Sequence, residues 1–431
     1  MIVNEKNRTD EPRITDPPPA RVSGRTPPAL IAVLVALNAV APFSIDMYLS
    51  AFPRMARDFN ASTSSIQLSL TAFLIGLASG QLIIGQLSDR FGRRTPLIVG
   101  SAICFGASVL CVLAPSIQIL ICLRFVQGFA GAAGVVIARA VIADRARGRA
   151  AVQLFSTMNF TSVLAPIAAP VLGGVIVTGL GWRAVFAALA VMNLCTLLGV
   201  VLFVNESLPE QRRRPSGLKA LASSVRSVLT NRHYLGYTTS SAFITAAMFA
   251  YVSASPFVLQ DIVGLSPAAY SYTFAACSLA VAAGSAVARC TVKSVAPRRV
   301  LVGGVIALMT ITALMLLTVT IGEVPPVPTI ALMGCFMAAI GFVYGHANML
   351  ATTEVHQAAG TGSAILGFLQ YTAGAIASPV VGVAGHSSAV PMGVVMFSTT
   401  AAAAATLLIL TRGHGGAAER GAPLICANTP P

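Results

Sequence analysis

The sequence predicts an all-α polytopic membrane protein, with twelve transmembrane helices in two pseudo-symmetric six-helix bundles. Three observations predict this fold class: the composition, the length of the apolar stretches, and motifs that recur in both halves. Of the 431 residues, 55% are hydrophobic and 10% are charged, and the mean hydropathy is +0.79. Soluble proteins carry about 25% charged residues. The composition therefore excludes a water-soluble enzyme, a nucleic-acid-binding module and a disordered protein.

Twelve apolar stretches are long enough to cross a bilayer, which takes about 20 residues of helix. We expect helices because lipid forbids unpaired backbone groups and the alternation typical of barrel strands is absent. The expected helices are 29–52, 65–87, 95–114, 116–140, 153–178, 184–205, 234–259, 268–290, 299–321, 329–351, 362–384 and 390–411. The expected organisation is a disordered N-tail at 1–28, bundles at 29–205 and 234–411, a linker at 206–233 and a C-tail at 412–431.

The distribution of basic residues predicts the orientation of the chain. If the N-terminus is inside, the inner segments hold 24 of the 28 Lys and Arg residues. The outer segments hold only Arg54, Arg57 and Arg183, and Arg124 falls within a helix. This bias predicts a multi-pass protein of the cell (inner) membrane, with the linker and both tails in the cytoplasm. The net charge of +14 is therefore explained by topology and does not indicate nucleic-acid binding.

Short motifs recur in the two halves at nearly constant spacing. The paired segments are Tyr48–Pro53 with Tyr251–Pro256, Gly92–Arg94 with Pro297–Arg299, and Ile167–Gly173 with Ile376–Gly382, at offsets of 203, 205 and 209 residues. Three matches in the same order indicate duplication of a six-helix unit. Tandem halves of this kind are typical of transporters that hold their site between the halves.

The loop after the second expected helix reads Gly85-Gln-Leu-Ser-Asp-Arg-Phe-Gly-Arg-Arg94. Gly85 and Gly92 permit close packing and a tight turn. Ordinary inner-side positive charge explains Arg90, Arg93 and Arg94 but not Asp89, the acid beside them. The segment resembles the G-x-L-x-D-R-x-G-R-R signature of the major facilitator superfamily, and the resemblance extends over all twelve helices.

This resemblance implies an inner latch. Asp89 would face the N-terminus of the helix at 362–384, where the helix dipole favours an anion. Arg93 would pair with Asp144 at the inner end of the fourth helix. These contacts would hold the inner side shut in the outward-open state. The repeat in the second half lacks the acid, because Ser294 stands in its place.

Two further motifs lie within expected helices. Leu123-Arg-Phe-Val-Gln-Gly128 resembles the superfamily's R-x-x-Q-G motif; the alternative is that Arg124 snorkels to the interface. Ala165-Pro-Ile-Ala-Ala-Pro-Val-Leu-Gly-Gly174 resembles the antiporter motif G-x-x-x-G-P-x-x-G-G. Pro166, Pro170, Gly173 and Gly174 are its candidate residues. A bend and close packing are the physical reasons for such residues, and general small-residue packing is the alternative.

Asp46 is the strongest candidate for a residue that couples transport to protons, because the expected helices hold almost no other acid. A desolvated carboxyl can take up a proton near neutral pH and so couple proton movement to substrate movement. The alternative is an acid at the outer interface. The segment Ser44–Pro53 resembles the helix 1 signature of Bcr/CflA-type drug-resistance transporters, including chloramphenicol and multidrug exporters. Some relatives carry a second acid about two turns earlier, where this chain offers Asn38.

The expected site combines proton coupling with an apolar cavity. Asp46 would cycle between charged and protonated forms, and Arg124 would tune it and position substrate. Candidate cavity residues are Asn38, Tyr48, Gln127, Phe249, Tyr251, Asn348 and Tyr371. Tyr344, His346 and Gln370 are further polar residues of the expected cavity helices, although a lone intramembrane His is more often a packing residue.

The residues and the resemblance together predict proton-coupled efflux of small drug-like compounds, including chloramphenicol-type antibiotics. We expect the proton as coupling ion, with no other cofactor, no metal site and no catalytic residue, in a monomer that contacts lipid but not nucleic acid. One alternative is a transporter of an endogenous metabolite, such as a sugar or amino-acid derivative, on the same fold. A receptor or enzyme would need an extramembrane domain or catalytic cluster, and a channel would show flux that does not saturate.

Overall fold

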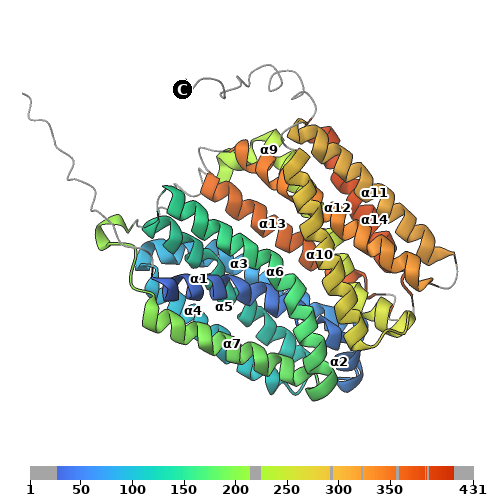
Figure 1. The fold of residues 1–431 in the computed structure, drawn as a ribbon, viewed down its shortest axis with the longest axis horizontal. Coiled ribbons are helices and arrows are strands. Elements are labelled where there is room, and N and C mark those ends of the chain that lie inside the picture. The colour runs from blue at the N-terminus through green and yellow to red at the C-terminus, as the bar shows by residue number, and fades with distance from the viewer. Residues whose placement is uncertain are drawn as a thin grey trace, which may run out of the picture.

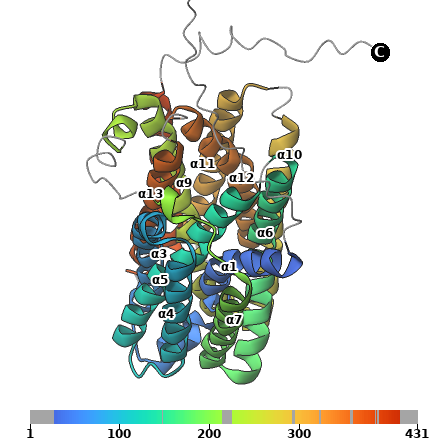
Figure 2. The same ribbon diagram turned by 90° about the vertical axis from the view of Figure 1, so that its left-hand side faces the viewer.

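The computed structural model describes residues 27–146, 148–213, 225–291, 295–321, 324–355, 359–383, 385 and 388–411. The expected tails, apart from residues 27 and 28, lie outside these ranges, as do Ser294 and the linker segment 214–224. Every long element within the described ranges is a helix. The helices form two groups, coloured blue to green and yellow to red (Figure 1), and in the rotated view the first group lies in front of the second (Figure 2).

The N-terminal half contains the first six of the twelve expected spans. Its elements are α1 (Pro28–Asp46), η1 (Leu49–Ala51), α2 (Phe52–Asp58), α3 (Thr63–Phe91), α4 (Arg94–Val112), α5 (Ile117–Arg145), α6 (Gly148–Leu180) and α7 (Trp182–Phe203). The first span differs from the expected single helix at 29–52. Its α-helix ends at Asp46, and the chain continues through the 3₁₀ turn η1 into α2, which has Pro53 in its first turn.

The C-terminal half contains the other six spans. Its elements are α9 (Arg232–Phe257), the π-turn η3 (Val258–Ile262), α10 (Pro267–Thr291), α11 (Pro297–Thr320), α12 (Pro326–Thr353), α13 (Ala359–Val380) and α14 (Val390–Leu410). Pro256, the repeat of Pro53, lies inside α9, directly before the π-turn. The repeated motif thus marks an irregular helix end in both halves, but only the first copy breaks the helix.

Eleven of the described spans are long and apolar enough to cross a membrane. The twelfth, α13, is a helix of 22 residues. It carries polar side chains such as Gln370 and packs against α3 and α9. A helix placed between the halves can carry these polar groups because protein rather than lipid covers much of it. The twelve-helix fold that we predicted is therefore confirmed.

Glycines allow close packing of equivalent helix pairs in the two halves, α3 with α5 and α10 with α12. In the N-terminal half, a Cβ at Gly76 of α3 would overlap the carbonyl oxygen of Phe125, and one at Gly128 of α5 would overlap that of Phe73. In the C-terminal half, Gly284 of α10 and Gly341 of α12 meet backbone of the partner helix in the same way. Such close approach is typical of small residues between membrane helices. The correspondence supports the duplication inferred from the sequence.

The halves are joined at one end of the molecule. We call the end with the α3–α4 turn and residues 204–213 the linker end, and the end with the α2–α3 turn the opposite end. At the opposite end, four hydrogen bonds connect the halves: Ser64 Oγ to Pro379 O (3.0 Å), Gln67 Nε2 to Ser253 O (3.0 Å), Thr71 Oγ1 to Ala375 O (2.9 Å) and Gln260 Nε2 to Ser50 O (3.2 Å). Together they form a seal at this end.

Candidate functional site

A cavity of about 250 Å³ lies between the two halves. Helices α1 and α6 of the first half form one wall, and α9, α10, α12 and α13 of the second half form the other. The lining residues are Ala41, Pro42, Ile45, Asp46, Ser162, Val163, Pro166, Thr245, Met248, Phe249, Val252, Phe274, Ser278, Val281, Ala282, Ser285, Met337, Tyr344, Gln370 and Tyr371. Most of them are apolar or aromatic, as in pockets for small organic ligands.

Asp46 is the ionisable acid among these lining residues. It is the last residue of α1, directly before the helix gives way to η1, and it is 7% exposed. An ionised carboxylate in apolar surroundings is costly unless it is paired. No Lys, Arg or His is among the described lining residues, so the cavity wall supplies no cation to Asp46. Asp46 is therefore a buried acid in the cavity wall, with no cation among the described lining residues.

Phe249 and Tyr371 lie in the cavity wall, as the sequence predicted. Their ring centroids are 6.5 Å apart, and they come from the adjacent helices α9 and α13. A Cβ at Gly374, one turn further along α13, would overlap the Phe249 ring, so this glycine lets the two helices approach. The pair gives the cavity a broad aromatic surface.

Arg124 does not lie in the cavity, contrary to our prediction that it positions substrate. It is fully buried inside the N-terminal half. Its guanidinium carbon lies 4.4 Å from the ring centroid of Tyr48, 4.3 Å from that of Phe73 and 5.8 Å from that of Phe186. Its Nη2 donates to the carbonyl oxygen of Ser44 at 2.7 Å. Arg124 thus reaches Asp46 only through the backbone, two residues away.

Four other predicted cavity residues also lie elsewhere in the described structure. Tyr48 packs on Arg124, and its hydroxyl lies 3.3 Å from Ser69 Oγ. Gln127 accepts a hydrogen bond from Arg124 and donates one to Ser108 Oγ at 2.7 Å. The remaining two are helix contacts. Asn38 joins α1 to α6 by donating to Met158 O and Ser162 Oγ, and the Tyr251 ring stacks on Phe274, 5.8 Å between centroids. In this conformation, these polar side chains serve contacts within one bundle.

Asn348 lies behind the cavity wall rather than in it. Its Oδ1 accepts from Gln370 Nε2 at 2.8 Å, and Gln370 lines the cavity. His346 is buried, with its Nδ1 3.0 Å from the Phe342 carbonyl oxygen and its ring 5.8 Å from that of Phe342. These contacts agree with the packing alternative for this histidine.

The proline- and glycine-containing segment of α6 has two structural roles. Pro166 lines the cavity, while Pro170, Gly173 and Gly174 lie nearer the opposite end. A Cβ at Gly173 would overlap the Met47 carbonyl oxygen within the same half, whereas one at Gly174 would overlap the Ser271 side chain of α10 in the other half. The two glycines therefore allow α6 to pack closely against the chain at Met47 and against α10.

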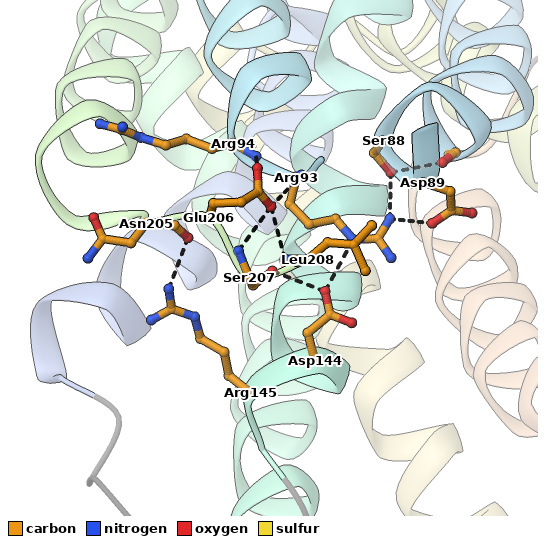
Figure 3. Close-up of polar contacts among 11 residues, drawn as sticks. Ser88, Asp89, Arg93, Arg94, Asp144, Arg145, Asn205, Glu206, Ser207 and Leu208 are labelled. Atoms are coloured by element: carbon orange, nitrogen blue, oxygen red, sulfur yellow. Dashed lines mark hydrogen bonds and ion pairs between the residues drawn. The ribbon is translucent and has the colours of Figure 1, made fainter. Parts of the chain in front are cut away.

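At the linker end, Arg93 pairs with Asp144, as the resemblance implied, and it also pairs with Asp89 (Figure 3). Its Nε lies 3.2 Å from Asp144 Oδ2 of α5. Its Nη1 donates to Asp89 and to Ser88 Oγ of α3. The Asp89 side chain is 55% exposed and forms its ion pair with Arg93. In this conformation the cluster acts within the N-terminal half.

Sequence reasoning missed Glu206, which completes this cluster. Its carboxylate accepts from the backbone N–H groups of Arg93 (2.8 Å), Arg94 (3.2 Å), Ser207 (3.0 Å) and Leu208 (2.9 Å). Burial opposes its ionisation, but these four donors outweigh burial and lower the pKa of Glu206 below its ordinary value. Its place directly after the sixth span, at the start of a strongly basic linker, was a usable signal.

Sequence reasoning also missed the small polar residues of the wall. Ser278 and Ser285 lie seven residues apart on α10 and both line the cavity, as does Thr245 of α9. A seven-residue spacing places two side chains on one face of a helix. Such a stripe of hydroxyls on an apolar span was a signal, although serine also occurs in ordinary helix contacts.

Comparison with known proteins identifies the family. The sequence pattern of the Major Facilitator Superfamily matches residues 34–379. The chain belongs to this superfamily. It is accordingly a multi-pass membrane transporter and not an enzyme, with its cavity between two six-helix halves.

Relatives with curated names include transporters and resistance proteins. The chain is 37% identical to "Uncharacterized MFS-type transporter YdgK" of Bacillus subtilis, over 91% of this chain and 98% of that one. It is 28% identical to "Bicyclomycin resistance protein homolog" of Haemophilus influenzae, over 84% and 91%. It is 31% identical to "Multidrug resistance protein MdtL" of Shigella flexneri, over 55% and 59%. These names agree with the predicted drug-resistance group.

Solved structures of low sequence identity share the fold. A mutant of the nucleoside transporter NupG matches with a TM-score of 0.74 and 11% identity, over 89% of this chain and 99% of that one. A D-xylose-proton symporter matches with a TM-score of 0.66 and 17% identity, over 88% and 97%.

Proposed function

We propose that this transporter exports small, mostly apolar drug-like compounds across the cell membrane in exchange for protons. It would work as a monomer with both termini and the linker end in the cytoplasm. The observation that carries the proposal is the position of Asp46: a buried carboxylate in an apolar cavity between the halves. The proton would be the coupling ion, and no other cofactor is needed.

The surroundings of Asp46 give a physical reason for exchange. An ionised carboxylate in this mostly apolar cavity, which Ile45, Phe249 and Val252 also line, carries a desolvation cost that a bound proton removes. An incoming compound would change the polarity around the Asp46 carboxyl and so favour release of its proton. Proton release and drug binding would then be coupled at one group, and the membrane potential, worth about 2.3 kcal/mol per charge per 100 mV, would drive exchange of a neutral drug.

Alternating access would use the two ends of the molecule in turn. The seal at the opposite end would separate, and the halves would close at the linker end. There Asp89 would leave Arg93 free to hold Asp144 and would face the N-terminus of α13, where the helix dipole favours an anion. Support for drugs as the substrates comes from the names of the relatives, which include bicyclomycin and multidrug resistance.

The proposal is tested by measuring drug-driven proton release in vesicles that contain Asp46→Asn. We expect exchange to be lost while the protein still folds, because Asn is similar in size and cannot be ionised. Asp58→Asn is the matched control, since Asp58 accepts from Trp182 Nε1 at 2.8 Å near the opposite end, outside the cavity. Wild-type exchange in Asp46→Asn would contradict the proposal. Unchanged tolerance to every drug, including phenicols, on expression would favour a metabolite substrate instead.

A further inference from the structure

We propose that four hydrogen-bonded residues, Ser241, Tyr344, Asn348 and Gln370, form a subsite for an uncharged group of the substrate that donates hydrogen bonds. We call these residues the amide quartet. The inference rests on the proposed function and deepens it. It names the preferred substrate class as neutral compounds that join an apolar body to hydroxyl or amide N–H groups.

The quartet is built from three helices of the C-terminal half. Gln370 Nε2 of α13 donates to Ser241 Oγ of α9 at 2.7 Å and to Asn348 Oδ1 of α12 at 2.8 Å. Tyr344 Oη of α12 donates to Gln370 Oε1 at 3.1 Å, and Ser241 Oγ donates to Asn348 Oδ1 at 3.1 Å. Gln370 is 6% exposed and is therefore held in one orientation before any ligand arrives.

The hydrogen bonds inside the quartet determine what it offers to a ligand. Both N–H groups of the Gln370 amide are used, and so is the O–H of Tyr344. A lone pair remains on Gln370 Oε1, because a carbonyl oxygen can accept two hydrogen bonds and Tyr344 donates one of them. Gln370 and Tyr344 both line the cavity. The quartet therefore presents the Gln370 carbonyl oxygen as an acceptor, and its ligand must supply a donor.

A second observation points to a ligand in the same cavity. Ser278 of α10 is 4% exposed and lines the cavity, and its hydroxyl has no hydrogen-bond partner within the described structure. An unsatisfied buried hydroxyl costs free energy, which a bound polar group would recover. A purely structural contact between α9, α12 and α13 would explain the quartet's internal hydrogen bonds, but it would explain neither the unpaired Ser278 hydroxyl nor the Gln370 acceptor at the cavity wall.

The quartet and Asp46 lie on different halves of the protein. The quartet carries no charge, while Asp46 of α1 supplies the carboxylate. Met248, Phe249 and Tyr371 line the same cavity and would cover the apolar body of the ligand. The quartet would thus recognise the donors of the substrate, and Asp46 would couple transport to the proton. Mutations in one of them should leave the role of the other intact.

Two phenicols provide a matched pair of probes. Thiamphenicol and florfenicol have the same skeleton, but florfenicol carries a fluorine in place of the primary hydroxyl, and so it lacks one donor. We would measure equilibrium binding of each to the purified full-length protein in detergent. We expect the wild-type protein to bind thiamphenicol about 5- to 10-fold more tightly, the effect of about one net hydrogen bond.

Gln370→Leu should bring this ratio close to one, since leucine removes both the acceptor and the amide that fixes Tyr344. Tyr344→Phe, a milder change that removes only the hydroxyl, should lower the ratio and guards against a folding defect in the first variant. Gln260→Leu is the matched control, because Gln260 hydrogen-bonds to Ser50 O in the seal, outside the cavity. It should keep the wild-type ratio.

The outcomes distinguish this inference from the proposed function. A wild-type protein that binds neither phenicol, or binds both equally, contradicts the inference, as does an unchanged ratio in folded Gln370→Leu and Tyr344→Phe. Drug export itself would still stand if the same protein binds tetraphenylphosphonium, a cation without donors, and exchanges it for protons. Asp46→Asn should retain the preference for thiamphenicol but lose proton release.

Discussion

The guanidinium of Arg124 lies over the ring of Tyr48, with its carbon 4.4 Å from the ring centroid, inside the N-terminal bundle. Phe73 covers the cation at 4.3 Å, and Gln127 and the Ser44 carbonyl accept its hydrogen bonds. Among the residues that the structure describes, no carboxylate forms an ion pair with it. The buried charge is therefore stabilised by aromatic faces and dipoles, and it fixes the backbone two residues before Asp46.

We predict that Arg124→Lys destabilises the protein by about 2 kcal/mol, because a compact ammonium group cannot stack on these rings and reach both acceptors. The measurement is denaturant unfolding of the purified protein. The control is Arg183→Lys, where an exposed arginine lies 4.2 Å from the Trp182 ring and the expected change is below about 0.5 kcal/mol. Equal losses of stability in the two variants would show that the aromatic cage does not stabilise Arg124.

Arg124 also shows where sequence reasoning reached its limit. Hydropathy finds the helices, because lipid accepts only long apolar spans, and the scarcity of acids singled out Asp46. Neither hydropathy nor the scarcity of acids predicts how a helix is rotated about its axis, and therefore which side chains face the cavity. Arg124, Asn38 and Gln127 face the interior of one bundle, while Phe249 and Tyr371 face the cavity. The resemblance did supply the Arg93–Asp144 pair, because that contact lies beside a short turn within one half and does not depend on how the halves face each other.

The close contact between α6 and α10 gives a second prediction. A side chain at Gly174 would collide with Ser271 across the two halves, so Gly174→Val should disfavour the sealed opposite end without unfolding either half. We expect faster labelling of a cysteine introduced at Ser253, which is fully buried at the seal, in a chain whose native cysteines are replaced.

Gly179→Val, on the same helix, is the control for this substitution. No atom lies within 4 Å of a Cβ built at Gly179, so the seal should stay closed and the labelling rate should stay at the wild-type value. Slow labelling in Gly174→Val, with transport unchanged, would mean that the α6–α10 contact does not hold the seal.

The contact between Glu206 and the α3–α4 turn gives a third prediction. Gly92 has a φ of 89°, a conformation that favours glycine, and a Cβ there would also overlap the Glu206 carboxylate. The turn thus directs the N–H groups of Arg93 and Arg94 at one oxygen pair. The first linker residues are held against the turn that directly follows the end of α3, where Asp89 lies.

The lowered pKa of Glu206 makes this anchor sensitive to pH. A carboxyl whose pKa is lower in the folded state stabilises that state above its ordinary pKa of 4.5, and the contribution is lost as the pH falls through the lower folded value. Glu206→Gln should therefore cost about 1 kcal/mol at pH 7, since solvent screens this exposed group, and the difference from wild type should shrink as the pH falls below 4.5. Thermal unfolding of both proteins between pH 7 and pH 4 measures this difference.

Glu210→Gln is the control. Glu210 forms an ion pair with Arg213 at 3.5 Å, but its side chain is 82% exposed, so the substitution should leave stability nearly unchanged. If Glu206→Gln and wild type differ equally at every pH, the carboxylate charge is not what holds the linker.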